Sequence, residues 1–371
     1  MQVDYSLRDP SAIPSPSLLF YKDLIRQNIA QAVALAGDAR KLRPHVKTHK
    51  TPEIVALERA AGIVRHKCAT LAEVKMLAHS GATDVLLAYP VVGPNVEHVA
   101  RLIRAFPSCR FSVVADDREA TRQLSASMAA HGLIVDVLLD LDVGMHRTGI
   151  APGAGAIALY ELFDELPGLR PDGLHAYDGH NHQESLAERE ACARRCLDEV
   201  LTLRATVEKK GLPVPRLVVG GTPTFPVYAR MELPGLECSP GTCFLHDHGY
   251  GTKFPDLPFV PAALLLTRVI SKPLPGRVTL DLGHKAVAGD PPLGQRCRLL
   301  DIPDCRQVGH SEEHLVIETP AAATLQPGDV LYAIPTHVCP TCALHRQAYV
   351  VEDGEVTETW EIAARDRMLR I

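Results

Sequence analysis

Apolar runs alternate with amphipathic stretches over the first two thirds of the chain. Between about residues 20 and 240 there are eight short apolar runs typical of buried strands, and segments with helical periodicity separate most of them. The runs are 41–47, 64–69, 84–89, 110–115, 134–141, 170–177, 216–221 and the less regular 236–240. The helical segments are 22–36, 52–62, 71–80, 95–105, 118–131, 154–165, 186–210 and a short one near 226–231. This alternation predicts parallel strands joined by helices.

Local signals support the predicted helices and favour a closed barrel. Thr51-Pro52 places a capping residue before a first-turn proline, and Thr70 with Glu73 forms a capping-box pattern. Runs such as DVLLAYP and LIVDVLLDLD are apolar enough to be buried on both faces. Eight such strands in about 220 residues predict an α/β fold of the (β/α)₈ TIM-barrel type rather than an open sheet.

From about residue 252 the pattern changes to short β-type runs separated by Pro-Gly, Gly-Asp and Asp-Gly turns. AALLLTRVIS, RVTLDLG, HLVIET, DVLYAIP, QAYVVE and VTETWEIA are the clearest of them. We therefore predict a second, C-terminal mostly-β domain. The expected boundaries are 12–250 for the barrel and 251–371, together with 1–11, for the β domain.

Composition narrows the class of protein. Hydrophobic residues make up 46% of the chain and charged residues 22%, which is ordinary for a globular protein. A net charge of −5 gives no electrostatic case for nucleic acid or an anionic membrane. No apolar run approaches the roughly 20 residues that span a bilayer, and the N-terminus has no signal-peptide pattern. Ten cysteines without a secretion signal favour reduced thiols, so a cytoplasmic location is expected.

Candidate binding and catalytic residues gather where the predicted strands end. This is the face on which barrels carry their functional sites. Gly220-Gly221-Thr222 follows the seventh run and Gly241-Thr242 the eighth, and each offers backbone N–H groups beside a hydroxyl. Either could be an ordinary glycine turn, but together they resemble a phosphate cradle. Other candidates after the strands are Lys47, Tyr89, Asp142, Arg147, Tyr177, His180 and His182.

Lys47 ends the first run, amid apolar and imidazole neighbours. A lysine in such a place can lose its proton by desolvation and attack an aldehyde. The plainer alternative is a solvated lysine at a strand end. A phosphate cradle on the same face of the barrel favours a role for Lys47 in binding a cofactor.

The motifs RPHVKTHKTPEI, DLDVGMHRTG, AYDGH, GGTPT, SPGT, SEEH and HVCPT occur in order along nearly the whole chain. In this set the sequence resembles the D-threonine aldolase and D-serine dehydratase group, the alanine-racemase-like, fold-type III pyridoxal-phosphate enzymes. The resemblance implies a head-to-tail homodimer and a small D-amino acid substrate. It implies a Schiff base on Lys47 and cofactor contacts from Arg147, Tyr177, Gly221, Thr222, Gly241 and Thr242. Cys243 departs from the aromatic residue often found in relatives.

His337 and Cys339 form a candidate metal pair in HVCPTCALH. Two apart on an extended strand, they would face the same way, and imidazole with thiolate suits Zn²⁺. A redox Cys339–Cys342 motif and a four-ligand structural zinc site are the rival interpretations. The resemblance favours metal, with cysteine typical of the zinc-dependent dehydratases and aspartate of Mn²⁺- or Mg²⁺-dependent aldolases.

We therefore expect a lyase of D-β-hydroxy amino acids in which Lys47 takes the α-proton and a metal activates the β-hydroxyl. Elimination to a keto acid and ammonia is favoured by Cys339, and retro-aldol cleavage to glycine and an aldehyde is the alternative that AYDGH supports. A racemase needs no metal pair, and a non-catalytic cofactor carrier needs no β domain.

Several histidines keep open roles. His180 and His182 could be acid–base groups near the substrate, and His45 and His49 could be hydrogen-bonding partners beside Lys47. His246 and His248 could suggest metal, but surface or packing roles are favoured for each of these histidines.

Overall fold

Seven parallel strands form one sheet in chain order in the computed structural model, which describes residues 3–369. Every neighbouring pair is parallel. They are β2 (Arg65–Cys68), β3 (Asp84–Leu87), β4 (Arg110–Ala115), β5 (Val135–Leu141), β6 (Leu169–Ala176), β7 (Leu217–Val219) and β8 (Leu236–Cys238). Each coincides with one of the predicted runs from residue 64 onward, and only β6 begins one residue before its run.

The first predicted run, 41–47, is not a regular strand, and in this respect the prediction was wrong. Segment 42–46, which we call the closing segment, nevertheless pairs with both edge strands through parallel bridges from Leu42 to Cys238 and from His45 to Lys67. Pro44 lacks an N–H and so interrupts a regular ladder, while its carbonyl still accepts from the Lys67 amide at 2.8 Å. The segment thus takes the place of the eighth strand and closes the barrel.

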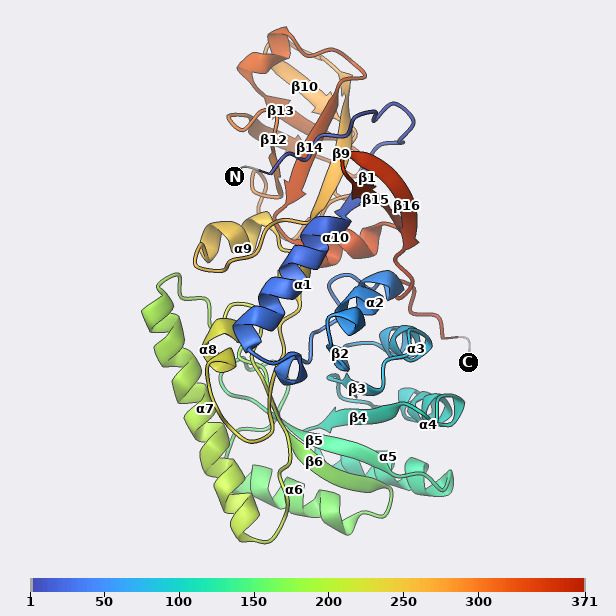
Figure 1. The fold of residues 1–371 in the computed structure, drawn as a ribbon, viewed down its shortest axis with the longest axis vertical. Helices are drawn as coiled ribbons and strands as arrows, with labels where there is room; N and C mark the ends of the chain where they lie inside the picture. The colour runs from blue at the N-terminus through green and yellow to red at the C-terminus, as the bar shows by residue number, and fades with distance from the viewer. Residues whose placement is uncertain (1–2, 370–371) are drawn as a thin grey trace. The chain divides into compact units, whose positions relative to one another are not determined.

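The predicted helices are present, with bounds that differ by a few residues. Figure 1 shows α3, α4 and α5 following one another beside the strands in chain order. Thr70 caps α3 by accepting from the Glu73 amide at 3.2 Å. The helices of this region are α1 (Lys22–Ala36), α2 (Pro52–Ala60), α3 (Leu71–His79), α4 (Asn95–Ala105), α5 (Arg118–Ala130), α6 (Ala154–Glu165), α7 (Leu186–Lys209) and α8 (Phe225–Ala229).

The chain groups into two units. The barrel unit contains Ala32–Lys47, Val55–Gly241 and the stretch from Asp366, and the β unit contains the stretch up to Gln31, Thr48–Ile54 and Thr242–Arg365. These units differ from the expected domains 12–250 and 251–371 (with 1–11), because the chain crosses between them more than once. The expected domain boundaries stay a prediction.

The β unit is built on a sheet in the order β12-β13-β10-β9-β1-β15-β16, with β14 pairing to both β9 and β11. The six clearest β runs of the sequence all become strands. The strands are β1 (Ser17–Tyr21), β9 (Ala263–Ser271), β10 (Arg277–Leu280), β11 (Cys297–Leu299), β12 (Arg306–His310), β13 (Leu315–Glu318), β14 (Val330–Pro335), β15 (Gln347–Glu352) and β16 (Glu355–Glu361).

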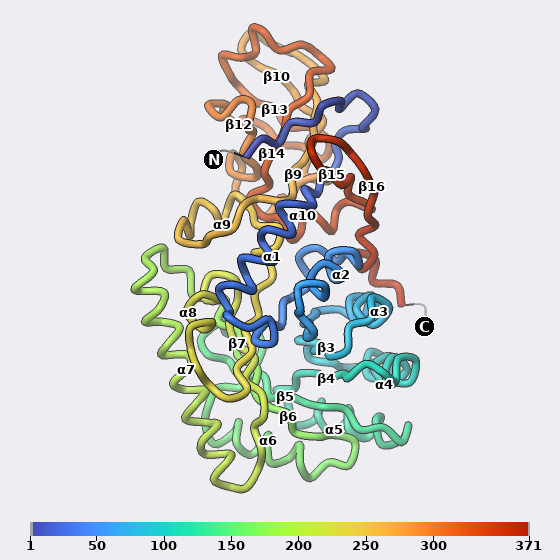
Figure 2. The backbone as a smooth tube through the Cα atoms, in the orientation of Figure 1, coloured from blue at the N-terminus to red at the C-terminus, as the bar shows by residue number. Residues whose placement is uncertain are grey.

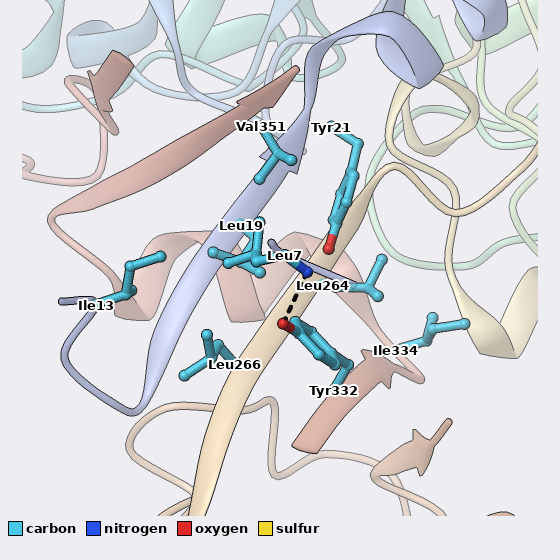
Figure 3. Close-up of a cluster of buried hydrophobic side chains, with 9 residues drawn as sticks. All are labelled: Leu7, Ile13, Leu19, Tyr21, Leu264, Leu266, Tyr332, Ile334 and Val351. Carbon is cyan, nitrogen blue, oxygen red and sulfur yellow. Dashed lines mark hydrogen bonds between the residues drawn. The ribbon is translucent and has the colours of Figure 1, made fainter. Parts of the chain in front are cut away.

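The N-terminal segment packs on this sheet, and Figure 2 shows its blue trace running beside the orange and red strands. Figure 3 shows the buried cluster that fixes it, in which the Leu7 amide donates to the Tyr332 hydroxyl at 3.0 Å. β1 was missed in the sequence because SLLFY runs directly into a helix without a turn signal. The cluster consists of Leu7, Ile13, Leu19, Tyr21, Leu264, Leu266, Tyr332, Ile334 and Val351.

Two short helices of the β unit were also missed, α9 (His248–Lys253) and α10 (Val338–Leu344). Both are too short for a readable helical period. α10 also carries Pro340, which is tolerated because it lies in the first turn. Among residues 3–369, no helix is both long and apolar enough to cross a membrane.

A buried ion network lies at the strand starts of the barrel unit. Arg43 of the closing segment is fully buried and pairs with Asp84 of β3 at 2.8 Å and with Glu237 of β8. The two carboxylates raise the pKa of Arg43 above its usual value even though burial opposes this. Arg43 therefore links the closing segment to strands on either side of it.

Replacing Arg43 by methionine should destabilise the protein by about 3–5 kcal/mol, because two carboxylates would lose their shortest ion pairs in a buried site. Asp84 would keep Arg216 and Glu237 would keep Arg65, each at 3.4 Å. The measurement is the free energy of unfolding by chemical denaturation. Arg40→Ala is the matched control, since the Arg40–Asp38 pair is exposed, with 78% of the arginine side chain accessible. The control should cost less than about 1 kcal/mol, and equal losses for the two variants would contradict the role of Arg43.

Candidate active site

Three cations surround one tyrosine ring at the strand ends of the barrel unit. Tyr177 directly follows β6, and its ring centroid lies 5.7 Å from Lys47 Nζ and 5.8 Å from Lys67 Nζ. The guanidinium carbon of Arg147, in the loop after β5, lies 5.0 Å from the same centroid. The structure thus brings together three residues that the sequence singled out, Lys47, Arg147 and Tyr177, with Lys67, which it did not.

The charge of this cluster suits an anionic ligand. Lys47, Lys67 and Arg147 bring three basic groups to one aromatic ring. Lys47 is half-buried and Arg147 is exposed, so both can be reached from solvent. Cations over an aromatic face are favourable but leave their charge uncompensated. An anionic phosphate or carboxylate would compensate it.

Glycines make room for the Tyr177 ring. A Cβ at Gly179 would lie 2.2 Å from a ring carbon of Tyr177, and one at Gly221 would lie 3.1 Å from another. A contact of 2.2 Å is impossible without displacing the ring, so glycine at 179 is required by close approach. The glycine of AYDGH therefore fixes where Tyr177 can lie.

Asp178 joins the loops that follow β6 and β7. Its buried carboxylate accepts hydrogen bonds from Asn181 Nδ2 at 3.0 Å, Thr224 Oγ1 at 2.9 Å and the Tyr228 hydroxyl at 2.8 Å. Burial raises the pKa of Asp178 although these donors oppose the shift. The sequence showed an aspartate after the sixth run but gave no sign of two of its partners, Thr224 and Tyr228, which are 46 and 50 residues away.

The four predicted phosphate contacts are placed in two neighbouring loops. The Gly241 amide donates to Thr222 Oγ1 at 3.1 Å, which links the loop after β8 to the loop after β7. The Gly221 amide donates to Thr224 Oγ1 at 3.3 Å. Thr242 begins a 3-10 turn, Thr242–Phe244, and its hydroxyl lies 3.6 Å from Cys339 Sγ in the β unit. The phosphate role of these residues stays a prediction.

The other histidines have local partners. His45 Nδ1 accepts from the Lys47 amide at 3.3 Å, and His49 Nδ1 accepts from the Thr51 amide at 3.1 Å. His180 Nε2 lies 3.8 Å from Cys196 Sγ. His182 is exposed, His248 contacts Thr252, and His246 packs against Phe259, where burial lowers the pKa of His246 to about 4.

The predicted metal pair lies at the start of α10, not on an extended strand, so the expected backbone was wrong. His337 is the N-cap residue and Cys339 lies in the first turn. The pair nevertheless comes together, because the two side chains are hydrogen-bonded. His337 Nδ1 contacts Asp290 Oδ2 at 2.6 Å. A carboxylate behind a ring nitrogen is the usual support of a metal-binding histidine, since it orients the other nitrogen towards the metal.

Asp247 anchors the backbone that carries this pair. Its buried carboxylate accepts from the Tyr250 amide at 2.8 Å and from the Val338 amide at 3.1 Å, so it caps both α9 and α10. Burial raises the pKa of Asp247 to about 6 despite these two bonds. Gly249 also lies close to the backbone of Thr336, since a Cβ at Gly249 would lie 2.4 Å from the Thr336 carbonyl oxygen. The HDHGY stretch thus has a structural use that its sequence did not reveal.

Hydroxyl groups accompany the thiol of Cys339. Thr48 Oγ1 lies 3.2 Å from Cys339 Sγ, and Thr48 follows Lys47 directly in the chain. In the described part of the chain, no group of three or more His, Cys, Asp or Glu side chains is arranged to hold a metal. Two side chains alone would leave further coordination positions of a metal ion for oxygen ligands, and the metal role of His337 and Cys339 stays a prediction.

Comparisons with known proteins agree with this arrangement. The family described as "Alanine racemase, N-terminal domain" matches residues 22–244, and the "Putative serine dehydratase domain" matches 262–351. The chain is 32% identical to a D-threonine aldolase of Arthrobacter sp., over 96% of this chain and 94% of the other. It is 27% identical to the D-threo-3-hydroxyaspartate dehydratase of Delftia sp., over 94% and 97%.

Among solved structures, the D-threonine aldolase from Filomicrobium marinum superposes with a TM-score of 0.87 at 29% identity, covering 95% of both chains. The fold is that of the alanine-racemase-like, fold-type III pyridoxal-phosphate enzymes. Within this class the chain belongs to the D-threonine aldolase and D-3-hydroxyaspartate dehydratase family, the lyases of D-β-hydroxy amino acids. The resemblance noted in the sequence is thereby confirmed.

Proposed function

We propose that the protein is a pyridoxal-phosphate- and zinc-dependent lyase that eliminates water from a D-β-hydroxy amino acid, giving a keto acid and ammonia. The observation that carries the choice of elimination is the imidazole–thiol pair of His337 and Cys339, with Asp290 behind the histidine. Nitrogen and sulfur ligands suit zinc better than magnesium or manganese. Structures of a D-threo-3-hydroxyaspartate dehydratase include variants at a histidine and at a cysteine two positions later, the latter in a metal-free form, which supports this assignment.

The barrel unit fits the cofactor through its charge and its space. Lys47 offers an amine, Arg147 and Lys67 add positive charge, and the glycines beside Tyr177 make room for its ring. We assign the phosphate of the cofactor to Gly221, Thr222, Gly241 and Thr242. When bound, pyridoxal phosphate supplies an electron sink for the pair released at Cα, and zinc supplies a Lewis acid for the β-hydroxyl.

The chain's own residues then move one proton and hold the substrate. The Lys47 amine takes the α-proton, and the electrons of the Cα–H bond form the new double bond as the β-hydroxyl leaves. The unsaturated product takes up water and releases ammonia, which balances the overall reaction. Arg147 and Tyr177 hold the reacting group in place, and Asp178 fixes the loop on which Tyr177 lies.

Retro-aldol cleavage is the second candidate, and a specific observation favours it. The identity to the Arthrobacter aldolase, 32%, exceeds the 27% to the Delftia dehydratase. In that reaction a base removes the β-hydroxyl proton and the Cα–Cβ bond breaks, so Lys47 would not take the α-proton. A metal ion at this position could serve either reaction, so the choice of elimination rests on the type of the second ligand, which is the thiol of Cys339 and not a carboxylate.

D-Threonine separates the two reactions by product. Elimination gives 2-oxobutanoate and ammonia, whereas retro-aldol cleavage gives glycine and acetaldehyde. We expect 2-oxobutanoate and an equal amount of ammonia. Deuterium at Cα should slow the reaction, because elimination breaks that bond. Glycine and acetaldehyde in equal amounts, formed without an isotope effect, would establish the aldolase instead.

The head-to-tail homodimer and the cytoplasmic location also stay predictions.

A further inference from the structure

Arg147 lies in a loop whose two ends are joined to each other. In this loop, which follows β5, the Asp142 amide donates to the Ile150 carbonyl at 3.1 Å, and the Ile150 amide donates to the Asp140 carbonyl at 3.0 Å. A Cβ at Gly149 would lie 2.6 Å from the Asp142 amide nitrogen, so the two ends can lie this close because residue 149 is glycine. The ends of the loop are therefore fixed, and the place of Arg147 depends on the path of the backbone between them.

The Asp142 carboxylate holds that path. Its Oδ1 accepts from the Gly144 amide at 3.0 Å and from the His146 amide at 2.9 Å, and its Oδ2 lies 2.7 Å from His146 Nδ1. Burial acts to raise the pKa of Asp142, but the hydrogen bonds from His146 and Gly144 lower this pKa below its usual value. The group is thus an ionised acceptor at neutral pH, and 16% of its side chain is exposed.

His146 adopts a backbone conformation that needs such support. Its φ is 52°, in the left-handed region that residues other than glycine seldom occupy. A conformation of this kind persists where surrounding contacts fix it. Burial does not provide them, since 82% of the His146 side chain is exposed, whereas Asp142 contacts both the amide and the ring of His146. Arg147 is the next residue, so the conformation of His146 sets the direction in which Arg147 leaves the backbone.

We propose that Asp142 is a positioning residue of the cofactor site, which holds His146 in its left-handed conformation and thereby places the Arg147 guanidinium over the ring of Tyr177. The guanidinium carbon lies 5.0 Å from the ring centroid, although Arg147 is an exposed residue of a loop. An arginine that is already held in place loses less conformational entropy when it contacts an anion. The role of Asp142 rests on the proposed function, because it requires Arg147 to contact the bound cofactor. Asp142 acts through Arg147 and takes no part in the chemical step.

The test is a double-mutant cycle on the dissociation constant of pyridoxal phosphate, measured by equilibrium dialysis of the holoenzyme and of each variant. Asp142→Ala should raise this constant by about 10-fold, and Arg147→Ala should raise it by about 10-fold or more. With Arg147 already replaced, Asp142→Ala should raise the constant by less than about 2-fold further, because Asp142 then has no guanidinium to position. A merely structural loss would instead add in full to that of Arg147→Ala.

Two matched variants accompany the cycle. Asp142→Asn keeps an oxygen that accepts from the Gly144 and His146 amides, so its dissociation constant should stay within about 3-fold of the wild type. Asp117→Ala removes a carboxylate that accepts from the Glu119 and Ala120 amides at the start of α5 in the same unit. This control should leave the dissociation constant of the cofactor unchanged.

Additive losses in the cycle, an unchanged constant in Arg147→Ala, or an Asn variant as weak as the Ala variant would overturn the role of Asp142 and leave the proposed function intact. If Asp142→Ala does not fold, Asp142→Glu takes its place in the cycle, because the longer side chain keeps the charge but displaces its oxygens from the two amides. Additive losses overturn the role of Asp142 there as well. A wild-type protein that does not bind pyridoxal phosphate would overturn the proposed function together with this role.

Discussion

Replacing Lys47 by alanine is expected to lower the lyase turnover number by about 10⁴-fold. Two separate tasks are lost at once, since Lys47 is both the proposed attachment point of the cofactor and the proposed base. The cofactor should still bind, because Arg147 and the glycine loops remain, but it should leave on dialysis. The measurements are the turnover number and the absorbance of the dialysed protein.

Lys41→Ala is the matched control for this variant. Lys41 lies six residues earlier in the same stretch, and its ammonium pairs with the exposed Glu232. Turnover and cofactor content should match the wild type there. Retention of a tenth or more of the turnover in Lys47→Ala would show that another amine carries the reaction.

Replacing Cys339 by alanine should remove the metal and lower turnover by about 10²-fold or more, because the Lewis acid that assists the leaving hydroxide is lost. The measurements are metal content of the purified protein by mass spectrometry and turnover with and without added zinc. Cys342→Ala is the matched control in the same helix. Burial raises the pKa of Cys342 well above its usual value, so that thiol is a poor metal ligand.

Variants around the pair should give graded effects. Asp290→Asn leaves both ligands in place but weakens the orientation of His337, and should lower zinc affinity by about 10- to 100-fold. Cys339→Asp should shift the preference towards Mn²⁺ or Mg²⁺, since a carboxylate is a harder ligand. Full zinc retention in Cys339→Ala, or loss of metal in Cys342→Ala alone, would contradict the assigned pair.

The sequence predicted what periodicity and turn chemistry determine. Long helices such as α4 and α6 match residue for residue, because their apolar positions repeat over several turns. The closing segment could not be read this way, since Pro44 interrupts its pairing and only its neighbours reveal its place in the barrel. The short α10 could not be predicted either. His337 and Cys339 lie at the start of this helix and not on the extended strand that was expected.

The residues that the sequence missed share a physical reason. Lys67, Asp178 and Asp247 owe their importance to partners that are distant in the chain, such as His175 for Lys67 and Val338 for Asp247. Burial and hydrogen-bond partners follow from the tertiary fold and leave no local pattern. By contrast, Lys47, Arg147 and Tyr177 lie in recognisable motifs at strand ends, and the structure brings them together around one ring.

Borohydride reduction of the purified holoenzyme, followed by peptide mapping, tests the central claim most directly. Reduction fixes the cofactor to the nitrogen that holds it, so the modified peptide identifies the lysine. We predict one modified peptide, carrying the cofactor on Lys47 within RPHVKTHK. Lys67 is the informative rival, because its amine lies at nearly the same distance from Tyr177. Modification of Lys67 in place of Lys47, or of no lysine at all, would contradict the account.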